Sequence, residues 1–325
     1  MSTSYDYQAL SQRLGYTELK GTEVLQSLWS GYGELVRLHV DETSIVIKHV
    51  QLPKPSHHPR GWNSDLSHQR KLKSYQVELH WYQRFAQVAD SHCPQPKPIV
   101  VEQQGTELLL VMEDLHQLGY TQTHQHAAPV QMEASLKWLA WFHASHIGER
   151  GDGLWDIGTY WHLDTRPDEL EALDDLSLKQ AAAQIDQVLR QAPYQTLVHG
   201  DAKLANFCFT FDGSEAAAVD FQYVGRGCAM KDVVLFMSSA VEPEQCDEME
   251  SWILDTYFSH LKRALNTLEP DIDANDVEQS WRSLFAIAWA DFHRFVKGWS
   301  PGHWKINDYT EALADKALEL LKAYP

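Results

Sequence analysis

The sequence predicts an α+β chain with two lobes, a small strand-rich lobe in residues 1–113 and a larger, mainly helical lobe in residues 114–325. Three observations support this fold class. β-Branched and alternating segments dominate before Glu113, and apolar residues recur at helical spacing after it. The length of 325 residues also exceeds the roughly 100–200 residues of an average domain, so it suits one large bilobal unit or two domains.

The first lobe is expected to contain a small antiparallel sheet and one long helix. The helix covers about Ser67 to Ala86, because Leu72, Tyr75 and Leu79 recur at three- and four-residue spacing. The sheet is predicted from five alternating or β-branched segments, which are Glu23–Trp29, Glu34–Val40, Ser44–Val50, Lys97–Glu102 and Glu107–Met112.

The second lobe is expected to be helical, with only short strands. The predicted helices are Ala127–His146, Leu176–Gln191, Met230–Val241, Glu244–Leu268, Asn275–Lys297 and Asp308–Leu321. The short strands are Thr196–Val198, Phe207–Thr210 and Ala216–Val219. Because binding sites often lie where two lobes meet, we expect a ligand at their junction.

Composition and charge exclude several classes of protein. Apolar residues make up 44% and charged residues 22%, as in ordinary globular chains. No apolar run approaches the ~18 residues of a membrane helix, and the N-terminus lacks signal-peptide character. The four Cys residues form no CxxC pair, which argues against disulfides or zinc and suits a cytoplasmic protein.

The acidic balance bears on possible partners. With 27 Lys and Arg against 45 Asp and Glu, the formal net charge is −18, which disfavours nucleic acid and anionic membranes as partners. It weakly favours cationic partners, although many enzymes are acidic simply to stay soluble. No obligate protein partner is predicted.

The densest chemical signal is HGDAKLAN at residues 199–206, followed by VDFQ at residues 219–222. An Asp and an Asn in HxDxxxxN spacing, then an Asp after a short apolar strand, suit phosphoryl transfer. One carboxylate orients or deprotonates the attacking hydroxyl, and Asn206 and Asp220 offer the hard oxygen ligands that Mg²⁺ prefers. Capping of turns or helices is the structural alternative, but three groups in this order favour catalysis.

The N-terminal half adds two weaker signals. IVIK at residues 45–48 places Lys48 in an apolar strand, and Glu78 follows about 30 residues later in the long helix, so an ion pair between them is expected. A solvated Lys48 and a local helix pair of Glu78 are the alternatives. The segment SGYG at residues 30–33 would let backbone amides approach phosphate oxygens, although a tight hairpin also requires glycine.

Taken in order, SGYG, IVIK, Glu78, VMEDL, HGDAKLAN and VDFQ resemble the choline/aminoglycoside phosphotransferase superfamily, which has a protein-kinase-like fold. The segments LWSGYGE, HPRGWNSDLSHQRKLKSYQVE and DFHRFVKGW are similar to the ecdysteroid-kinase-like branch and its bacterial relatives. The resemblance covers roughly Val24 to Trp304. HGDxxxxN and DF are highly specific in combination, whereas the Gly-rich segment is not.

This resemblance implies an ATP- and Mg²⁺-dependent transfer of phosphate to a small-molecule hydroxyl. It implies Asp201 as the catalytic base, Asn206 and Asp220 as metal ligands, and Lys48 as the phosphate-binding lysine with Glu78 as its partner. The other nucleotide contacts would come from the Gly-rich segment and from a hinge that meets the adenine edge. These residues are Ser30, Gly31, Gly33, Met112, Glu113, Asp114 and Leu115.

Departures from the protein-kinase pattern argue against a protein substrate. Gly200 replaces the Arg of HRD, Gln222 replaces the Gly of DFG, and no Ala-Pro-Glu follows. Only about a dozen residues separate Asp220 from Asp232, too few for a peptide-docking activation segment. Asp232 is expected to cap the following helix and to brace the catalytic loop.

The acceptor is expected to bind in the helical lobe, where aromatic residues gather. Asp291 would hydrogen-bond a substrate hydroxyl or face solvent. The other candidate wall residues are Trp289, His293, Trp299 and Trp304, and a packed core helix is an equally good explanation for them. Abundant Trp and Tyr favour a bulky or partly apolar alcohol.

Three further features and two rival functions complete the expectations. His143 and His146 have zinc-like spacing, but no third convergent ligand lies near them in the sequence, which favours a role in structural packing. Lys203 would steady the γ-phosphate or remain solvated. A catalytically silent nucleotide-binding scaffold is the main alternative function, and a metal-dependent hydrolase is a weaker one. Neither GxGxxG nor GxxxxGK[ST] is present.

Overall fold

The computed structural model describes residues 5–28, 31–52, 63–86 and 91–324, with side chains from residue 66 onward in the helix that begins at Asn63. The chain divides into two compact units. Unit 1 comprises Met1–Ala89 and Gln95–Thr121, and unit 2 comprises Asp90–Pro94 and Gln122–Pro325. Unit 1 contains the antiparallel sheet and unit 2 most of the helices, so the predicted fold class is confirmed.

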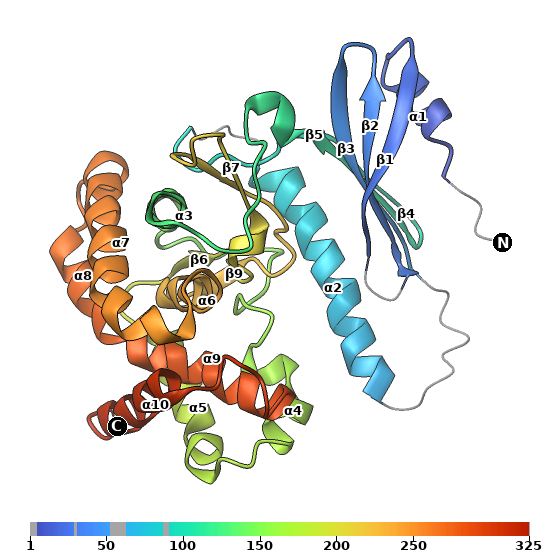
Figure 1. Cartoon of the computed structure of the whole chain (residues 1–325). Helices are drawn as coiled ribbons and strands as arrows, with labels where there is room; N and C mark the ends of the chain where they lie inside the picture. The colour runs from blue at the N-terminus through green and yellow to red at the C-terminus, as the bar shows by residue number, and fades with distance from the viewer. Residues whose placement is uncertain (1–4, 29–30, 53–62, 87–90, 325) are drawn as a thin grey trace. The chain divides into compact units, whose positions relative to one another are not determined.

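Unit 1 is built on a five-stranded antiparallel sheet of order β1-β2-β3-β5-β4 (Figure 1). All five predicted strands are present, with ends shifted by a few residues. Their bounds are β1 Leu19–Ser27, β2 Gly33–Val40, β3 Thr43–Gln51, β4 Pro98–Gln104 and β5 Glu107–Glu113. The central strand β3 lies between β2 and β5 and is buried over most of its length, including its polar residues Ser44, Lys48 and His49.

Two helices cover the sheet of unit 1. The short helix α1, Tyr7–Arg13, was not predicted, and it inserts Leu10 into a cluster with Val36 and Ile47. The long helix α2, Asn63–Arg84, confirms the predicted helix and runs along the sheet in Figure 1. Because successive residues of a strand point to opposite faces, Ile47 faces α1 while Lys48 faces Glu78 of α2.

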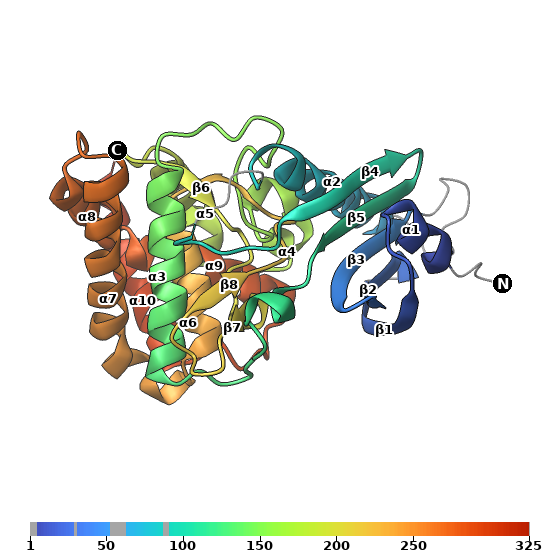
Figure 2. The same cartoon turned by 90° about the horizontal axis from the view of Figure 1, so that it is seen from above.

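Unit 2 is a bundle of helices around a very apolar central helix, α9. Figure 2 shows α3 and α7 side by side, and α9 packs against α5, α6 and α10. The bounds are α3 Pro129–Ser145, α4 Pro167–Glu171, α5 Leu176–Arg190, α6 Met230–Ala240, α7 Cys246–Leu268, α8 Ala274–Ser283, α9 Phe285–Trp299 and α10 Asp308–Leu321. Nearly all of α9 is buried, and its internal charges, Asp291 and Arg294, are paired with each other at 2.6 Å, as buried charges require.

One predicted helix of unit 2 is wrong. The segment Asn275–Lys297 forms two helices, α8 and α9, which are separated at Leu284. The Leu284 amide closes a tighter turn by donating to the Trp281 carbonyl at 2.9 Å. No Gly or Pro marks this break in the sequence, and Trp281 and Phe285 on either side of it are both buried.

Two small antiparallel strand pairs in unit 2 flank the loops that carry the HGDAKLAN and VDFQ motifs. β6, Thr196–Val198, pairs with β9, Gly225–Gly227, and β7, Phe207–Phe209, pairs with β8, Ala216–Ala218. β9 was not predicted because two of its three residues are glycine, which is uncommon in strands. The short 3₁₀ helices are Leu115–Leu118, Leu163–Thr165, Leu204–Asn206 and Pro243–Gln245.

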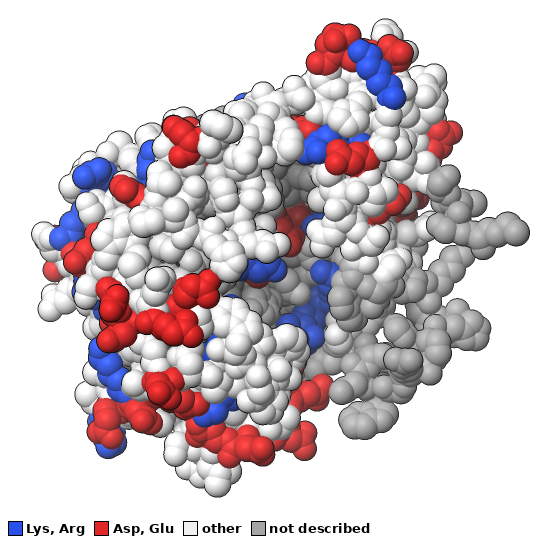
Figure 3. All heavy atoms as spheres, in the orientation of Figure 1, with Lys and Arg blue, Asp and Glu red and all other residues white. Residues whose placement is uncertain are grey.

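The surface and the cysteines add little chemistry of their own. Figure 3 shows acidic side chains in several separate groups, with Lys and Arg between them. The four cysteines form no disulfide. Within the described part of the chain, no helix is both long and apolar enough to span a bilayer.

Candidate active site

The predicted ion pair of unit 1 is present. Lys48 Nζ on β3 lies 2.9 Å from Glu78 Oε1 and 2.7 Å from Oε2 on α2. Both side chains are buried, at 9% and 5% exposure, so neither is the solvated residue of the alternative interpretation. A buried ion pair is stable only when each charge keeps its partner. The pair therefore fixes the Lys48 ammonium on the face of the sheet that packs against α2.

The Gly-rich segment is shaped chiefly by the hairpin between β1 and β2. A side chain at Gly33, which has φ +147°, would collide with the His49 carbonyl of β3, so close strand packing requires glycine there. The Gly31 amide donates to the Leu28 carbonyl at 3.1 Å, so in this structure it serves the hairpin rather than a ligand. Ser30 lies outside the described residues.

The hinge residues connect β5 to a 3₁₀ helix in unit 1. Met112 and Glu113 end β5, and the Glu113 amide donates to the Lys97 carbonyl at 2.9 Å. Leu115 is buried at the start of the 3₁₀ helix. Whether the backbone here meets a nucleotide stays a prediction.

Asp114 in this hinge is held by unit 1 itself. Its carboxylate accepts hydrogen bonds from Arg37 Nε and Ser44 Oγ, both at 2.6 Å. Burial acts to raise the pKa of Asp114, but the hydrogen bonds from these two residues and the Arg37 charge bring it below its ordinary value. The side chain therefore orders the start of the 3₁₀ helix, whose His116 amide it also binds.

The catalytic-motif loop of unit 2 arranges polar groups around Asp201. Asp201 is 5% exposed, and its Oδ2 accepts from Asn206 Nδ2 and Lys203 Nζ, each at 3.0 Å. Its Oδ1 is buried and has no hydrogen-bond partner among the described residues. A buried carboxylate with one oxygen fixed and the other unsatisfied is costly to keep, which marks this position as a site rather than a turn cap.

Asp220 lies close enough to Asp201 for its charge to affect the pKa of Asp201. Burial raises the pKa of Asp201, the Lys203 charge lowers it, and the Asp220 charge raises it again, with a net upward shift. Asp220 has φ +69°, a rare conformation for a residue with a side chain, and its Oδ1 accepts from Gln222 Nε2 at 2.7 Å. Strained residues of this kind cluster at functional sites.

The donor set near Asp201 fits a magnesium ion. Because the amide nitrogen of Asn206 is engaged by Asp201, its carbonyl oxygen is the atom left to bind a metal. With a carboxylate of Asp220 this makes a set of hard oxygen donors. Among the described residues, no group of three or more His, Cys, Asp or Glu side chains is arranged to hold a metal ion, and Mg²⁺, which keeps several waters, needs few protein ligands.

The buried carboxylate of Asp232 holds the backbone of the catalytic-motif loop. Asp232 accepts from the His199 amide at 2.6 Å and the Gly200 amide at 2.9 Å. It does not cap α6 as expected, because it is the third residue of that helix and its side chain is used by the loop. His143 Nε2 also lies 3.1 Å from Asp232, and its Nδ1 lies 2.8 Å from the Tyr257 hydroxyl, so His143 has a packing role.

The segment at Thr159 and Tyr160, which the sequence analysis missed, is hydrogen-bonded to the catalytic-motif loop. The Tyr160 amide donates to the Gly200 carbonyl, and the Thr159 amide donates to the Tyr223 carbonyl, both at 3.2 Å. Thr159 has φ +117°, which strains a β-branched residue. At Gly200, with φ +78°, a side chain would strike the Tyr223 carbonyl, so this crossing of chains requires glycine.

The acceptor prediction for Asp291 needs correction. Asp291 on α9 is 0% exposed, so it does not face solvent. Its oxygens are held by Arg294 at 2.6 Å, Lys231 at 3.3 Å and Trp161 Nε1 at 3.0 Å. Burial would raise the pKa of Asp291, but the Arg294 and Lys231 charges hold it far below its ordinary value. The described contacts therefore engage it in the core.

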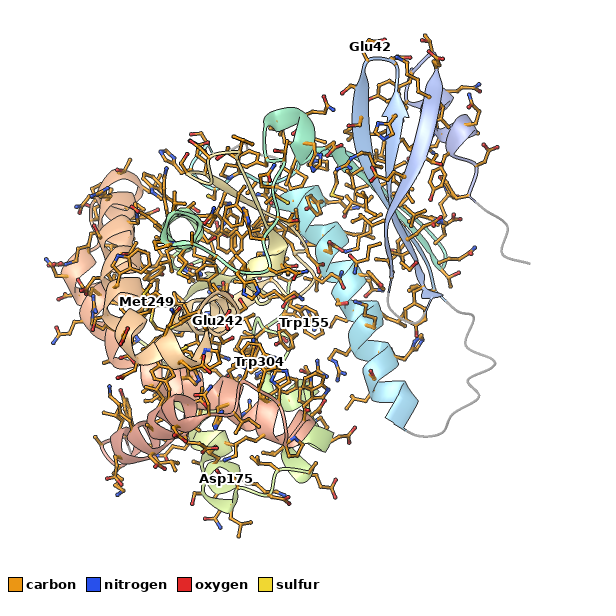
Figure 4. The ribbon with its side chains drawn as sticks, viewed as in Figure 1. Glu42, Trp155, Asp175, Glu242, Met249 and Trp304 are labelled. Atoms are coloured by element: carbon orange, nitrogen blue, oxygen red, sulfur yellow. The ribbon has the colours of Figure 1, made fainter. Side chains whose placement is uncertain are left out.

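The four aromatic and His candidates fall into two pairs. Trp289 and His293 are 2% exposed and border a cavity of only about 10 Å³, which leaves no space for a ligand. Trp299 and Trp304, the latter labelled next to α9 in Figure 4, are 58% and 57% exposed. Trp299 borders a larger cavity of about 210 Å³, together with Tyr160, Arg166, Phe292, Phe295, Val296, His303 and Lys305.

Comparisons with known proteins identify the family. Residues 60–265 match the phosphotransferase enzyme family over more than half of the chain. The chain belongs to this family. The predicted superfamily and the predicted phosphotransferase class are thereby confirmed, and the ecdysteroid-kinase-like branch stays a prediction. No curated protein matches the chain.

Several solved structures resemble this phosphotransferase over nearly the full length of both proteins. A microcompartment-associated aminopropanol kinase has a TM-score of 0.52 at 14% identity, covering 98% of this chain and 97% of its own. Choline kinase LicA from Streptococcus pneumoniae has a TM-score of 0.48 at 13% identity, covering 98% and 99%. A spectinomycin phosphotransferase, in complex with ADP and spectinomycin, has a TM-score of 0.47 at 13% identity, covering 97% of each chain. The aminopropanol kinase likeness supports the kinase-like fold.

Proposed function

We propose that the chain transfers the γ-phosphate of ATP to the hydroxyl of a small-molecule alcohol. One observation carries the proposal: Asp201 is buried with one oxygen held by Asn206 and Lys203, while the other has no hydrogen-bond partner among the described residues. That second oxygen is where a hydroxyl would donate. Membership of the phosphotransferase family and the fold likeness to an aminopropanol kinase support the same reaction.

Asp201 acts as the base in this proposal. It accepts the hydroxyl proton at Oδ1 while the hydroxyl oxygen attacks the γ-phosphorus, so that the alcohol leaves as a phosphate ester and ADP is released. An upward-shifted pKa makes the carboxylate a better proton acceptor. Asn206 and Lys203 hold Oδ2 and so fix the direction of Oδ1.

Nucleotide binding is assigned to the remaining predicted residues. Asn206 and Asp220 would hold Mg²⁺, which when bound neutralises charge on the transferring phosphates. Lys48, held by Glu78, would bind the α- and β-phosphates. The proposal includes a cytoplasmic location, which suits four cysteines that form no disulfide.

The test replaces Asp201 by Asn, which keeps the shape and removes the base. We expect kcat to fall about 10³-fold with an accepted alcohol, while ATP binding measured by calorimetry is retained. Asp315→Asn, at an exposed position of α10, is the matched control and should leave kcat unchanged. Wild-type turnover by Asp201→Asn would refute the assignment, and ATP binding with no turnover of any alcohol by the native chain would indicate a silent scaffold.

A further inference from the structure

The cavity of about 210 Å³ in unit 2 has walls of two chemical kinds. Aromatic residues make up half of the lining. Phe295 packs edge-to-face against Tyr160, with ring centroids 5.6 Å apart, and stacks on Trp299 with centroids 6.1 Å apart. The remaining polar lining residues, Arg166, His303 and Lys305, are all basic, and no Asp or Glu of the described chain lines the cavity. A pocket of rings with a few convergent polar groups is the usual form of a small-molecule site.

This cavity adjoins the catalytic loop. The Tyr160 amide is bonded to the Gly200 carbonyl, one residue before Asp201. Burial raises the pKa of Tyr160, and the Asp201 charge raises it further, so the two side chains lie within electrostatic reach. The Tyr160 carbonyl in turn accepts from Arg166 Nε at 2.7 Å, which ties the cationic wall to the same segment.

Of the two cavity residues Arg166 and Lys305, Lys305 has the charge that is less compensated by neighbouring acidic groups. Its Nζ donates to Ser238 Oγ at 3.0 Å and lies 5.3 Å from the centre of the Phe292 ring, and it forms no ion pair within the described residues. Burial lowers the pKa of Lys305 to about 8, against the raising effect of Asp201. Asp201 itself is paired with Lys203. By contrast, Arg166 already has Glu169 at 3.1 Å.

We infer that this cavity binds the acceptor alcohol through a carboxylate group, with Lys305 as its counter-ion and the aromatic wall against its apolar body. The inference rests on the proposed function, because it assigns the acceptor site of that reaction. A single uncompensated ammonium suits one negative charge. A cationic acceptor, such as the substrates after which choline and aminopropanol kinases are named, would be attracted by the ring faces, but it would be repelled by the basic side chains of this lining.

Binding tests the inference without any turnover. The probes are benzoate, benzyl alcohol and benzylamine, titrated by calorimetry into the full nucleotide-free chain at pH 7. We expect benzoate to bind tightest of the three. Lys305→Met should weaken benzoate about tenfold or more, because a charge-assisted hydrogen bond is lost, whereas Lys305→Arg should retain most of the affinity. Lys322→Met, at an exposed lysine of the same unit, is the control and should change nothing.

Two outcomes would overturn the inference. One is benzylamine binding as tightly as benzoate, and the other is benzoate affinity that is unchanged in Lys305→Met. The second would mean that Lys305 serves only to pack against Phe292 and Trp304, whose ring centres lie 5.3 and 5.5 Å from its Nζ.

Turnover separates this inference from the proposed reaction. With Mg·ATP, 4-(hydroxymethyl)benzoate should release ADP faster than 4-(hydroxymethyl)benzylamine, and Lys305→Met should raise KM more than it lowers kcat. If the amine is the better acceptor, the inference is wrong while the kinase reaction stands. If neither probe is phosphorylated but benzoate binding still depends on Lys305, the anion site is supported and the phosphate transfer is contradicted for this class of alcohol.

Discussion

Asp201 and Asp291 are two buried carboxylates of the same unit, and their surroundings differ in one decisive respect. Asp201 is 5% exposed and keeps Oδ1 without a hydrogen-bond partner among the described residues. Asp291 is 0% exposed and is surrounded by Arg294, Lys231 and Trp161. The pKa shifts accordingly run in opposite directions, upward for Asp201 and downward for Asp291.

The comparison shows that burial alone does not identify a catalytic carboxylate. Burial raises the pKa of both groups, and neighbouring cations reverse its effect only at Asp291. An incompletely satisfied carboxylate can accept a proton from a substrate, whereas a fully paired one stabilises the fold. Substitutions at the two positions should therefore have opposite consequences.

The largest expected effect on stability is at Asp291. Asp291→Ala leaves Arg294 and Lys231 buried without their partner, so the free energy of unfolding should fall by about 3–5 kcal/mol. Urea denaturation measures it, with Asp315→Ala as the exposed control. In contrast, Asp201→Asn removes a carboxylate that burial disfavours, so stability should stay level or rise. A stable Asp291→Ala would break the comparison.

The ion pair of unit 1 should show a mixed effect. Lys48→Met removes a proposed phosphate ligand, and kcat/KM for ATP should fall about 10- to 100-fold. The variant also leaves Glu78 buried alone, so it should be less stable than the double variant Lys48→Met/Glu78→Gln. Steady-state kinetics and urea denaturation measure the two effects. Equal kcat/KM in wild type and Lys48→Met would remove Lys48 from the nucleotide site.

The same comparison predicts a pH dependence. The pKa of Asp291 is depressed in the folded chain, so its stabilising effect is complete above the ordinary value near 3.8 and is lost as pH falls below it. One such group changes stability by at most about 1.4 kcal/mol per pH unit. Urea midpoints between pH 5 and pH 3 should fall more steeply for wild type than for Asp291→Asn. Parallel curves would contradict the assignment.

The smallest effect is expected at the strained segment beside the loop. Thr159 has φ +117°, a conformation that glycine adopts without strain. Thr159→Gly should therefore raise the free energy of unfolding by about 0.5–1 kcal/mol, as measured by thermal denaturation. Gly200→Ala, which meets the Tyr223 carbonyl, should instead destabilise the chain. A destabilised Thr159→Gly would show that the side chain contributes packing that outweighs the strain.

Sequence patterns predicted those elements that depend on interactions between residues close together in the chain. Alternation predicted all five strands of unit 1, and apolar periodicity predicted α2. The break at Leu284 and the short helix α1 escaped because the first depends on tertiary packing and the second is a single short amphipathic stretch. Asp291 was misplaced for a similar reason: no local pattern announces that Lys231 and Trp161, distant in sequence, will meet it.

The sequence by itself determined the order of chemically active groups, because motif spacing places a carboxylate, an amide and a second carboxylate on short loops between strands. Only the tertiary structure decided which carboxylate is satisfied, that Asp232 supports the loop, and that Tyr160, Arg166 and Lys305 line one cavity. The physical reason is that hydrogen-bond satisfaction and charge compensation depend on partners far apart in the chain, which packing alone brings together.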